Sequence, residues 1–126
     1  MDAKALPTLT SPDGRTTATI EDAMEIAMGG PTFGRLTLSN GMFRESCNPS
    51  MVWSEDSEYL AVPQWTKERA QRLLVISVVR RSARYAPSEY RVLELRAFRN
   101  GKIRGIDSPI FMPQAIEVDV TALGWD

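Results

Sequence analysis

Three carboxylates and a tryptophan are the side chains of this chain whose types and spacing best suit contact with another molecule. Glu55, Asp56 and Glu58 share one polar turn, and Trp65 lies in the connector that follows. Clustered carboxylates attract a positively charged protein surface and speed its association. Tryptophan is enriched among the residues that contribute most to binding energy. We therefore predict that these four side chains form a partner-binding site, with Trp65 beside the acidic turn, for a toxin or basic enzyme.

Histidine is absent from the chain, and Cys47 is the single cysteine. Ser-His-Asp triads and Cys-His pairs both require histidine, so this chain can form neither. The commonest general base in enzymes is also missing. One cysteine cannot supply a thiolate zinc site or an internal disulfide. No spacing singles out a carboxylate pair for glycoside hydrolysis, and Gly29-Gly30 is not followed by the lysine of a phosphate-binding loop. We therefore predict a non-enzymatic protein without a metal or cofactor.

Charge is unevenly distributed along the chain. Residues 1–63 hold four basic and nine acidic side chains, and residues 64–126 hold eleven basic and seven acidic ones. This split predicts either two faces of opposite charge or, if the halves interleave, a mixed surface. The basic set is Arg69, Arg72, Arg80, Arg81, Arg84, Arg91, Arg96, Arg99, Lys102 and Arg104.

An arginine-rich face next to aromatic residues could bind single-stranded nucleic acid by phosphate pairing and base stacking. Tyr85 and Tyr90 would be the stacking residues. The isoelectric point of about 5.5 argues against this alternative, because nucleic-acid-binding domains are normally basic.

Short β-strands are the elements that must position these residues. Apolar segments at Met51–Trp53 and Tyr59–Val62 and the β-branched run Arg72–Val79 are separated by polar corners. Asn40-Gly41 and Asn100-Gly101 predict tight hairpins, because both turn positions tolerate a positive φ. The sequence predicts eight or nine strands and no substantial helix.

Several boundaries follow from breaker residues. We predict a connector at Pro63–Gln71, with one helical turn capped by Thr66, and a basic loop at Arg80–Ser88. Tyr90–Phe98 alternates cleanly and predicts one strand. Ala23–Met28 is interpreted as a strand, and Thr121–Asp126 as a tail.

A faint repeat with an offset of 43 residues relates two turn segments. Ser11-Pro12-Asp13-Gly14 corresponds to Ser54-Glu55-Asp56-Ser57, and Ala18 corresponds to Ala61. Over residues 11–79 this pattern resembles the blade repeat of WD-repeat and TolB-like β-propellers, in which a Ser-x-Asp-Gly turn precedes a strand. Ser57 stands where that family usually has glycine. The resemblance implies propeller-like sheets, although three blades cannot close a propeller.

These observations predict a mainly β fold, an antiparallel meander of short strands that forms a compact sandwich or propeller-blade-like sheets. Residues 1–10 are expected to be a flexible N-terminus and residues 11–126 a single β domain. With no apolar run long enough for a membrane span, we expect a cytoplasmic protein. The predicted function is protein binding, specifically a bacterial inhibitor or immunity protein. An oligomeric, propeller-like scaffold is the structural alternative.

Overall fold

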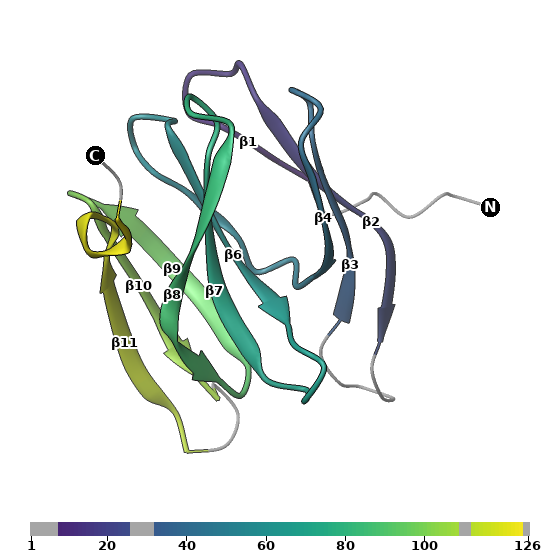
Figure 1. Cartoon of the computed structure of the whole chain (residues 1–126), viewed down its shortest axis with the longest axis vertical. Helices are drawn as coiled ribbons and strands as arrows, with labels where there is room; N and C mark the ends of the chain where they lie inside the picture. Colours follow the sequence, from purple (N-terminus) through teal and green to yellow (C-terminus); the bar gives the residue numbers. More distant parts are fainter. Residues whose placement is uncertain (1–7, 26–31, 109–111, 125–126) are drawn as a thin grey trace.

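The structure, a computed structural model, describes residues 8–25, 32–108 and 112–124. Within these residues it contains eleven β-strands and one short 3-10 helix (Figure 1). The first six strands are β1 Thr8–Thr10, β2 Thr17–Glu25, β3 Thr32–Leu38, β4 Phe43–Cys47, β5 Val52–Trp53 and β6 Tyr59–Trp65. The remaining elements are β7 Gln71–Ser77, β8 Ser82–Tyr90, β9 Leu93–Arg99, β10 Lys102–Asp107, β11 Gln114–Asp119 and the helix η1 Val120–Leu123. The predicted mainly β, antiparallel meander is confirmed.

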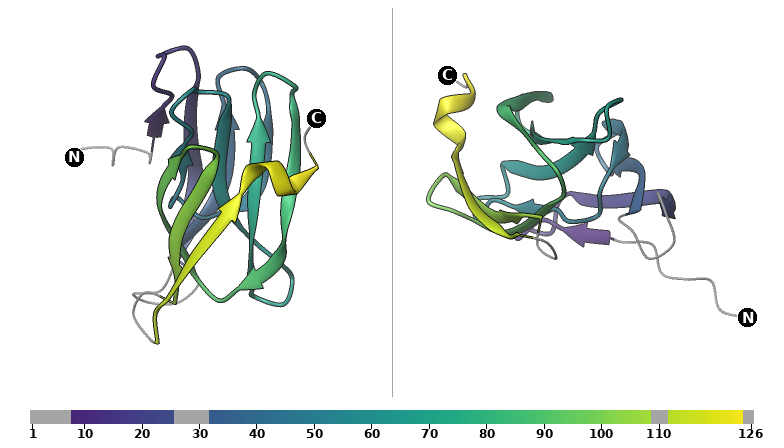
Figure 2. Two further views of the ribbon diagram at one scale, coloured as in Figure 1. Left: turned by 90° about the vertical axis from the view of Figure 1, so that its left-hand side faces the viewer. Right: turned by 90° about the horizontal axis from the view of Figure 1, so that it is seen from below.

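Two antiparallel sheets make up the described part of the chain. The large sheet has the strand order β1-β2-β3-β4-β6-β7-β8, and β5 pairs with β6 at its side. This sheet curls into a half-barrel, and the small sheet β11-β10-β9 covers part of its outer side (Figure 2). The curl brings the tips of two hairpins together. Arg81 Nη1 of the β7–β8 turn donates to Asn40 O of the β3–β4 turn at 3.0 Å.

Strands β6 and β7 separate two hydrophobic cores. Leu74 and Ile76 face the inside of the half-barrel, whereas Leu73 and Val75 face the small sheet. Burial on both faces explains the uninterrupted apolar run of β7, since an alternating pattern is expected only where one face meets water. The first core contains Ala18, Ile20, Leu36, Leu38, Cys47, Met51, Trp53, Leu60, Val62, Leu74 and Ile76. The second contains Ala61, Leu73, Val75, Ala86, Leu93, Leu95, Phe98, Ile103, Val120 and Leu123.

The Asn100-Gly101 hairpin forms as predicted between β9 and β10. Asn100 has φ 54° and Gly101 has φ 75°, and Arg99 pairs with Lys102 across the turn. Two successive positive φ angles match the twist of the flanking strands, and Asn-Gly tolerates them best. The Asn40-Gly41 turn likewise joins β3 and β4, with Gly41 N donating to Leu38 O at 2.9 Å.

The predicted loop Arg80–Ser88 is wrong over most of its length, because strand β8 begins at Ser82. Pro87 misled the prediction, since proline cannot donate to a strand ladder. It is accommodated because β8 is the last strand of the large sheet and the register shifts between Arg72 and Leu74. The proline therefore lies in a bulge at a sheet edge.

The predicted single strand Tyr90–Phe98 is interrupted at residues 91–92. There the chain leaves the large sheet and enters the small one. Asp107 Oδ1 accepts hydrogen bonds from Arg91 N at 2.9 Å and from Val92 N at 3.2 Å. Asp107, which stabilises this change of direction, is therefore 15 or more residues away in sequence, so the local sequence could not predict it.

Other boundaries also differ. Strand β6 continues to Trp65 and β7 begins at Gln71, so the predicted connector Pro63–Gln71 shortens to residues 66–70. The predicted helical turn does not form there, and a non-helical turn joins the two strands. Thr66 still supports this turn, because its Oγ1 accepts from the N–H groups of Glu68 and Ala70, each at 3.2 Å.

The two ends of the chain differ from the prediction as well. Thr8–Thr10 were assigned to a flexible N-terminus but form β1, and the predicted tail begins within η1. Residues 1–7, 26–31, 109–111 and 125–126 lie outside the described part, including the end of the predicted strand Ala23–Met28.

Candidate functional site

The acidic turn between β5 and β6 is held together by Asp56. Its Oδ1 accepts from Ser54 Oγ at 2.6 Å and from Glu58 N at 3.0 Å. Ser54 Oγ in turn accepts from Tyr59 N at 3.0 Å. A side chain that accepts from its own turn replaces backbone hydrogen bonds that the bend removes. Asp56, predicted to bind a partner, therefore has a structural task in the fold.

The sequence repeat corresponds to two copies of this same turn. Asp13 Oδ1 accepts from Ser11 Oγ at 2.7 Å and from Arg15 N at 2.9 Å, as Asp56 does 43 residues later. Ser11 Oγ accepts from Thr16 N at 3.1 Å, as Ser54 Oγ does from Tyr59 N. The hydrogen bonds from Ser11 and then from Arg15 hold the pKa of Asp13 below its ordinary value of 3.8.

The other two predicted carboxylates are also engaged within the fold. Glu55 is exposed, and its Oε1 accepts from Asn100 N of the β9–β10 hairpin at 2.7 Å. Glu58 forms an ion pair with Arg80 at 3.5 Å. The structure thus brings Glu55, Asp56 and Glu58 together, as the sequence predicted, and gives each an internal partner. Their role in binding another protein stays a prediction.

Trp65 lies at the opposite end of β6 from the acidic turn. The strand runs from Tyr59 to Trp65, six residues farther on, which is about 20 Å at the rise of a β-strand. Trp65 is therefore not beside the carboxylates. Its Nε1 is buried without a hydrogen-bond partner, and so is Nε2 of Gln71, the residue directly opposite on β7.

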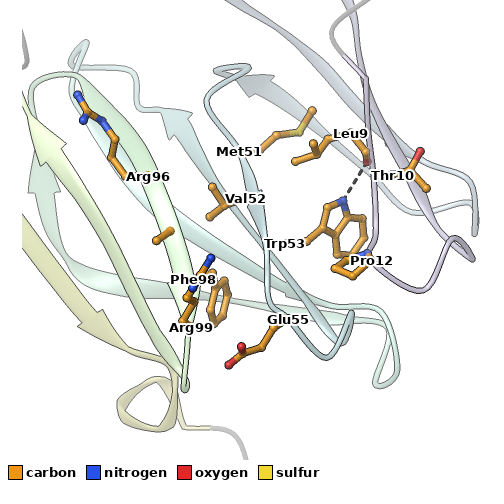
Figure 3. A pocket seen from close by; sticks show the side chains of 11 residues that line it. Leu9, Thr10, Pro12, Met51, Val52, Trp53, Glu55, Arg96, Phe98 and Arg99 are labelled. Carbon is orange, nitrogen blue, oxygen red and sulfur yellow. Dashed lines mark hydrogen bonds between the residues drawn. The ribbon is translucent and has the colours of Figure 1, made fainter.

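A groove lies between strands β1, β5 and β9 and has a volume of about 430 Å³ (Figure 3). Its lining comes from three distant parts of the sequence. The lining residues are Leu9, Thr10, Pro12, Met51, Val52, Trp53, Glu55, Arg96, Ala97, Phe98 and Arg99. Of the four predicted site residues, Glu55 alone belongs to it. No local pattern marks such a groove in sequence, because it depends on where β9 lies relative to β5.

The floor of the groove is apolar and draws on both cores. Met51 and Trp53 belong to the first core, and Val52 and Phe98 pack in the second. Trp53 is 8% exposed and donates from Nε1 to Leu9 O at 2.9 Å (Figure 3). The groove thus lies over the boundary between the two hydrophobic cores.

Two side-chain bridges join the edges of β5 and β9. Leu95 N donates to Ser50 Oγ at 2.8 Å, and Asn100 N donates to Glu55 Oε1 at 2.7 Å. Both pairs are 45 residues apart in sequence, so the two segments run side by side in the same direction. Among the described strands, however, β5 pairs only with β6 and β9 only with β10.

The wall formed by β9 is positively charged. Arg96 and Arg99 are both exposed and line the groove. Arg96 is ion-paired with Glu94, which lies outside the groove, whereas none of the ion pairs among the described residues involves Arg99. Glu55, the carboxylate in the lining, already accepts from Asn100 N. The groove therefore combines an apolar floor with two guanidinium groups on one side.

The arginines of the basic set do not share one element. Arg80, Arg81 and Arg84 lie on or beside the β7–β8 hairpin, and Arg96 and Arg104 lie on the small sheet. Arg104 is ion-paired with Glu117 at 2.7 Å. The Arg80–Glu58 pair joins the basic and acidic halves of the sequence, which supports the mixed-surface alternative.

Reactive groups are scarce in the described residues. Among them, no three carboxylate, thiol or imidazole side chains are grouped closely enough to hold a metal ion. Cys47 is buried, and its burial raises the pKa of the thiol to about 12. A thiol that stays protonated at neutral pH is a poor nucleophile.

Comparison with known proteins provides no relative: no family model, curated protein or solved structure matches the chain. In the described part of the structure, no helix is both long and apolar enough to cross a membrane.

Proposed function

We propose that this protein is a non-enzymatic protein-binding domain and that its partner docks in the groove between β1, β5 and β9. The observation that carries the proposal is the groove itself, which has an apolar floor and is lined by segments from three parts of the chain. A concave and mostly apolar surface is a common docking site for a partner. The apolar floor supplies the burial that drives such docking.

An extended protein segment suits the groove better than a compact small molecule does. The lining follows three strands and stays open to solvent, whereas small-molecule sites enclose most of the surface of their ligand. A protein segment that lies along the groove would contact lining residues of all three strands at once.

Neutralisation of a toxic partner is the specific form of the proposal. The absence of histidine from the chain supports a binding role over a catalytic one. In this form the docked segment belongs to the toxic enzyme, and the complex abolishes that enzyme's activity.

Selection from a displayed library of random ten-residue peptides tests the proposal. Peptides enriched on the wild-type protein should lose binding to Ala97→Arg and Val52→Arg, which fill the groove, and keep binding to Gln114→Arg on β11. Circular dichroism of each variant checks that it is folded. Enriched peptides that bind all variants equally, or a selection that enriches none, would overturn the groove assignment. A concentration-dependent oligomer in light scattering would instead favour the scaffold alternative.

A further inference from the structure

We infer that the side chains of Trp65 and Gln71 hold one buried water molecule between them, at the junction of the two sheets. This site lies at the end of β6 opposite the acidic turn and shares no residue with the groove, so it does not depend on the proposed function. Three observations support it. The two side chains are neighbours, each has a buried N–H group without an acceptor, and neither can satisfy the other.

Trp65 and Gln71 are directly opposite each other on β6 and β7. Thr66 N donates to Ala70 O at 2.8 Å, so Thr66 and Ala70 form a hydrogen-bonded pair at the end of this ladder. Hydrogen-bonded and non-hydrogen-bonded pairs alternate along antiparallel strands, which makes Trp65 with Gln71 a non-hydrogen-bonded pair. The side chains of such a pair lie on the same face and are closer than those of a hydrogen-bonded pair.

Both side chains face the small sheet. Gln71 lies two residues before Leu73 on β7, and Leu73 belongs to the second core, which packs against that sheet. Alternate residues of a strand point to the same face. The contact of Gln71 agrees with this direction, because its Oε1 accepts from Leu93 N, at the start of β9, at 2.6 Å. The pair therefore lies beside the corner where the chain passes from the large sheet to the small one.

Each side chain has a buried donor that the rest of the fold does not satisfy. Among the residues that the structure describes, none accepts a hydrogen bond from Trp65 Nε1 or from Gln71 Nε2, and both atoms are buried. The amide of Gln71 cannot turn over to change this, because Nε2 would then face Leu93 N, and two donors do not pair. The indole nitrogen is also only a donor, so the two groups cannot bind each other.

A single water molecule satisfies both groups. Its oxygen has two lone pairs and can accept from Trp65 Nε1 and Gln71 Nε2 at once, which is the usual task of water buried in proteins. Two buried donors without acceptors cost more free energy than the immobilisation of one water molecule does. A larger acceptor, such as a carboxylate of a partner, cannot reach atoms that are closed off from the surface. The indole N–H of Trp65 thus has a task inside the fold.

Solution NMR of the isotope-labelled protein tests this inference. In NOE and ROE spectra recorded with selective excitation of water, a bound water molecule gives peaks of opposite sign, whereas proton exchange with solvent gives the same sign in both. The indole N–H of Trp65 should show the opposite-sign peak. The indole N–H of Trp53 is the internal control, because it donates to Leu9 O, and it should show none. Trp65→Phe and Trp53→Phe assign the two resonances.

Removal of one of the two donors tests whether the water is shared. Gln71→Met removes Nε2 and should abolish the Trp65 peak, whereas Gln114→Met, at an exposed position on β11, is the matched control and should leave it unchanged. Circular dichroism checks that both variants are folded. Absence of the peak in the wild type, a peak of the same sign in both spectra, or a peak that survives Gln71→Met overturns the inference. The wild-type comparison of Trp65 with Trp53 decides the matter even if Gln71→Met does not fold.

Discussion

Asp13 N donates a hydrogen bond to Ser57 Oγ at 2.9 Å, and this bond joins the two repeated turns. Ser57 occupies the position in the second turn that Gly14 occupies in the first, and both have a positive φ, 64° and 76°. A side chain at such a φ costs about 1 kcal/mol or more, which glycine avoids. The serine is therefore strained, but its hydroxyl provides a contact that glycine could not.

Substitution of Ser57 separates these two effects. Ser57→Ala keeps the strain and removes the acceptor of Asp13 N, so it should lower the free energy of unfolding by about 1–2 kcal/mol. Ser57→Gly loses the same bond but relieves strain of about 1 kcal/mol, so its stability should lie close to that of the wild type. Urea denaturation of the two variants measures the difference. If Ser57→Gly is more stable than the wild type by the full strain energy, the bond between the turns contributes nothing.

The stability of the first turn should depend on pH through Asp13. Its pKa in the folded protein lies below 3.8, chiefly because Ser11 Oγ donates to the carboxylate. A lowered folded-state pKa means that the stabilisation is complete above pH 3.8 and is lost as the pH falls through the folded-state value.

Comparison of the wild type with Asp13→Asn tests this dependence. The asparagine keeps an acceptor oxygen but not the charge, so the variant should be less stable at pH 6. The difference should shrink as the pH falls below about 3.8, where the wild-type carboxylate also becomes neutral. Denaturant unfolding at several pH values between 2.5 and 6 measures it. A difference that stays constant over this range would show that Asp13 does not act through its charge.

Local patterns in the sequence predicted those parts of the fold that local contacts determine. The Asn100-Gly101 hairpin, the apolar run of β7 and the repeated Ser-x-Asp turns are each specified within a few residues, and the structure contains them. Strand β8 was not predicted because a strand accepts Pro87 only at a sheet edge or a bulge, and neither is visible in the local sequence.

The candidate site was less predictable than the fold. The acidic turn could be predicted because its carboxylates are neighbours in sequence. The contacts of these carboxylates could not: Glu55 accepts from Asn100 N, 45 residues away, and Glu58 pairs with Arg80, 22 residues away. The groove depends on the same long-range packing of β9 against β5. Residue types and spacing therefore indicated the acidic turn, but not the internal partners of its carboxylates.

Cys47 should be unreactive in the folded protein. It is buried in the first core, and burial raises the pKa of its thiol to about 12. Labelling with a thiol-specific reagent at pH 8 should be much slower for the native protein than for the protein unfolded in guanidinium chloride, where the pKa returns to about 8.5. Rapid labelling of the native protein, at a rate close to that of the unfolded chain, would contradict the buried placement of Cys47.

Gln71 should be the polar core residue that is most sensitive to substitution. It is fully buried, and its Oε1 accepts from Leu93 N at 2.6 Å, which ties β7 to the start of β9. Gln71→Met preserves the volume but leaves Leu93 N without an acceptor, and it also removes Nε2, which has no partner within the described part of the protein. Because the second effect offsets part of the first, the variant should lower the free energy of unfolding by about 1 kcal/mol. The same change at Gln114, which is exposed on β11, is the control and should alter stability by less than about 0.5 kcal/mol. Equal effects at the two positions in urea denaturation would show that the Gln71–Leu93 bond does not stabilise the junction between the sheets.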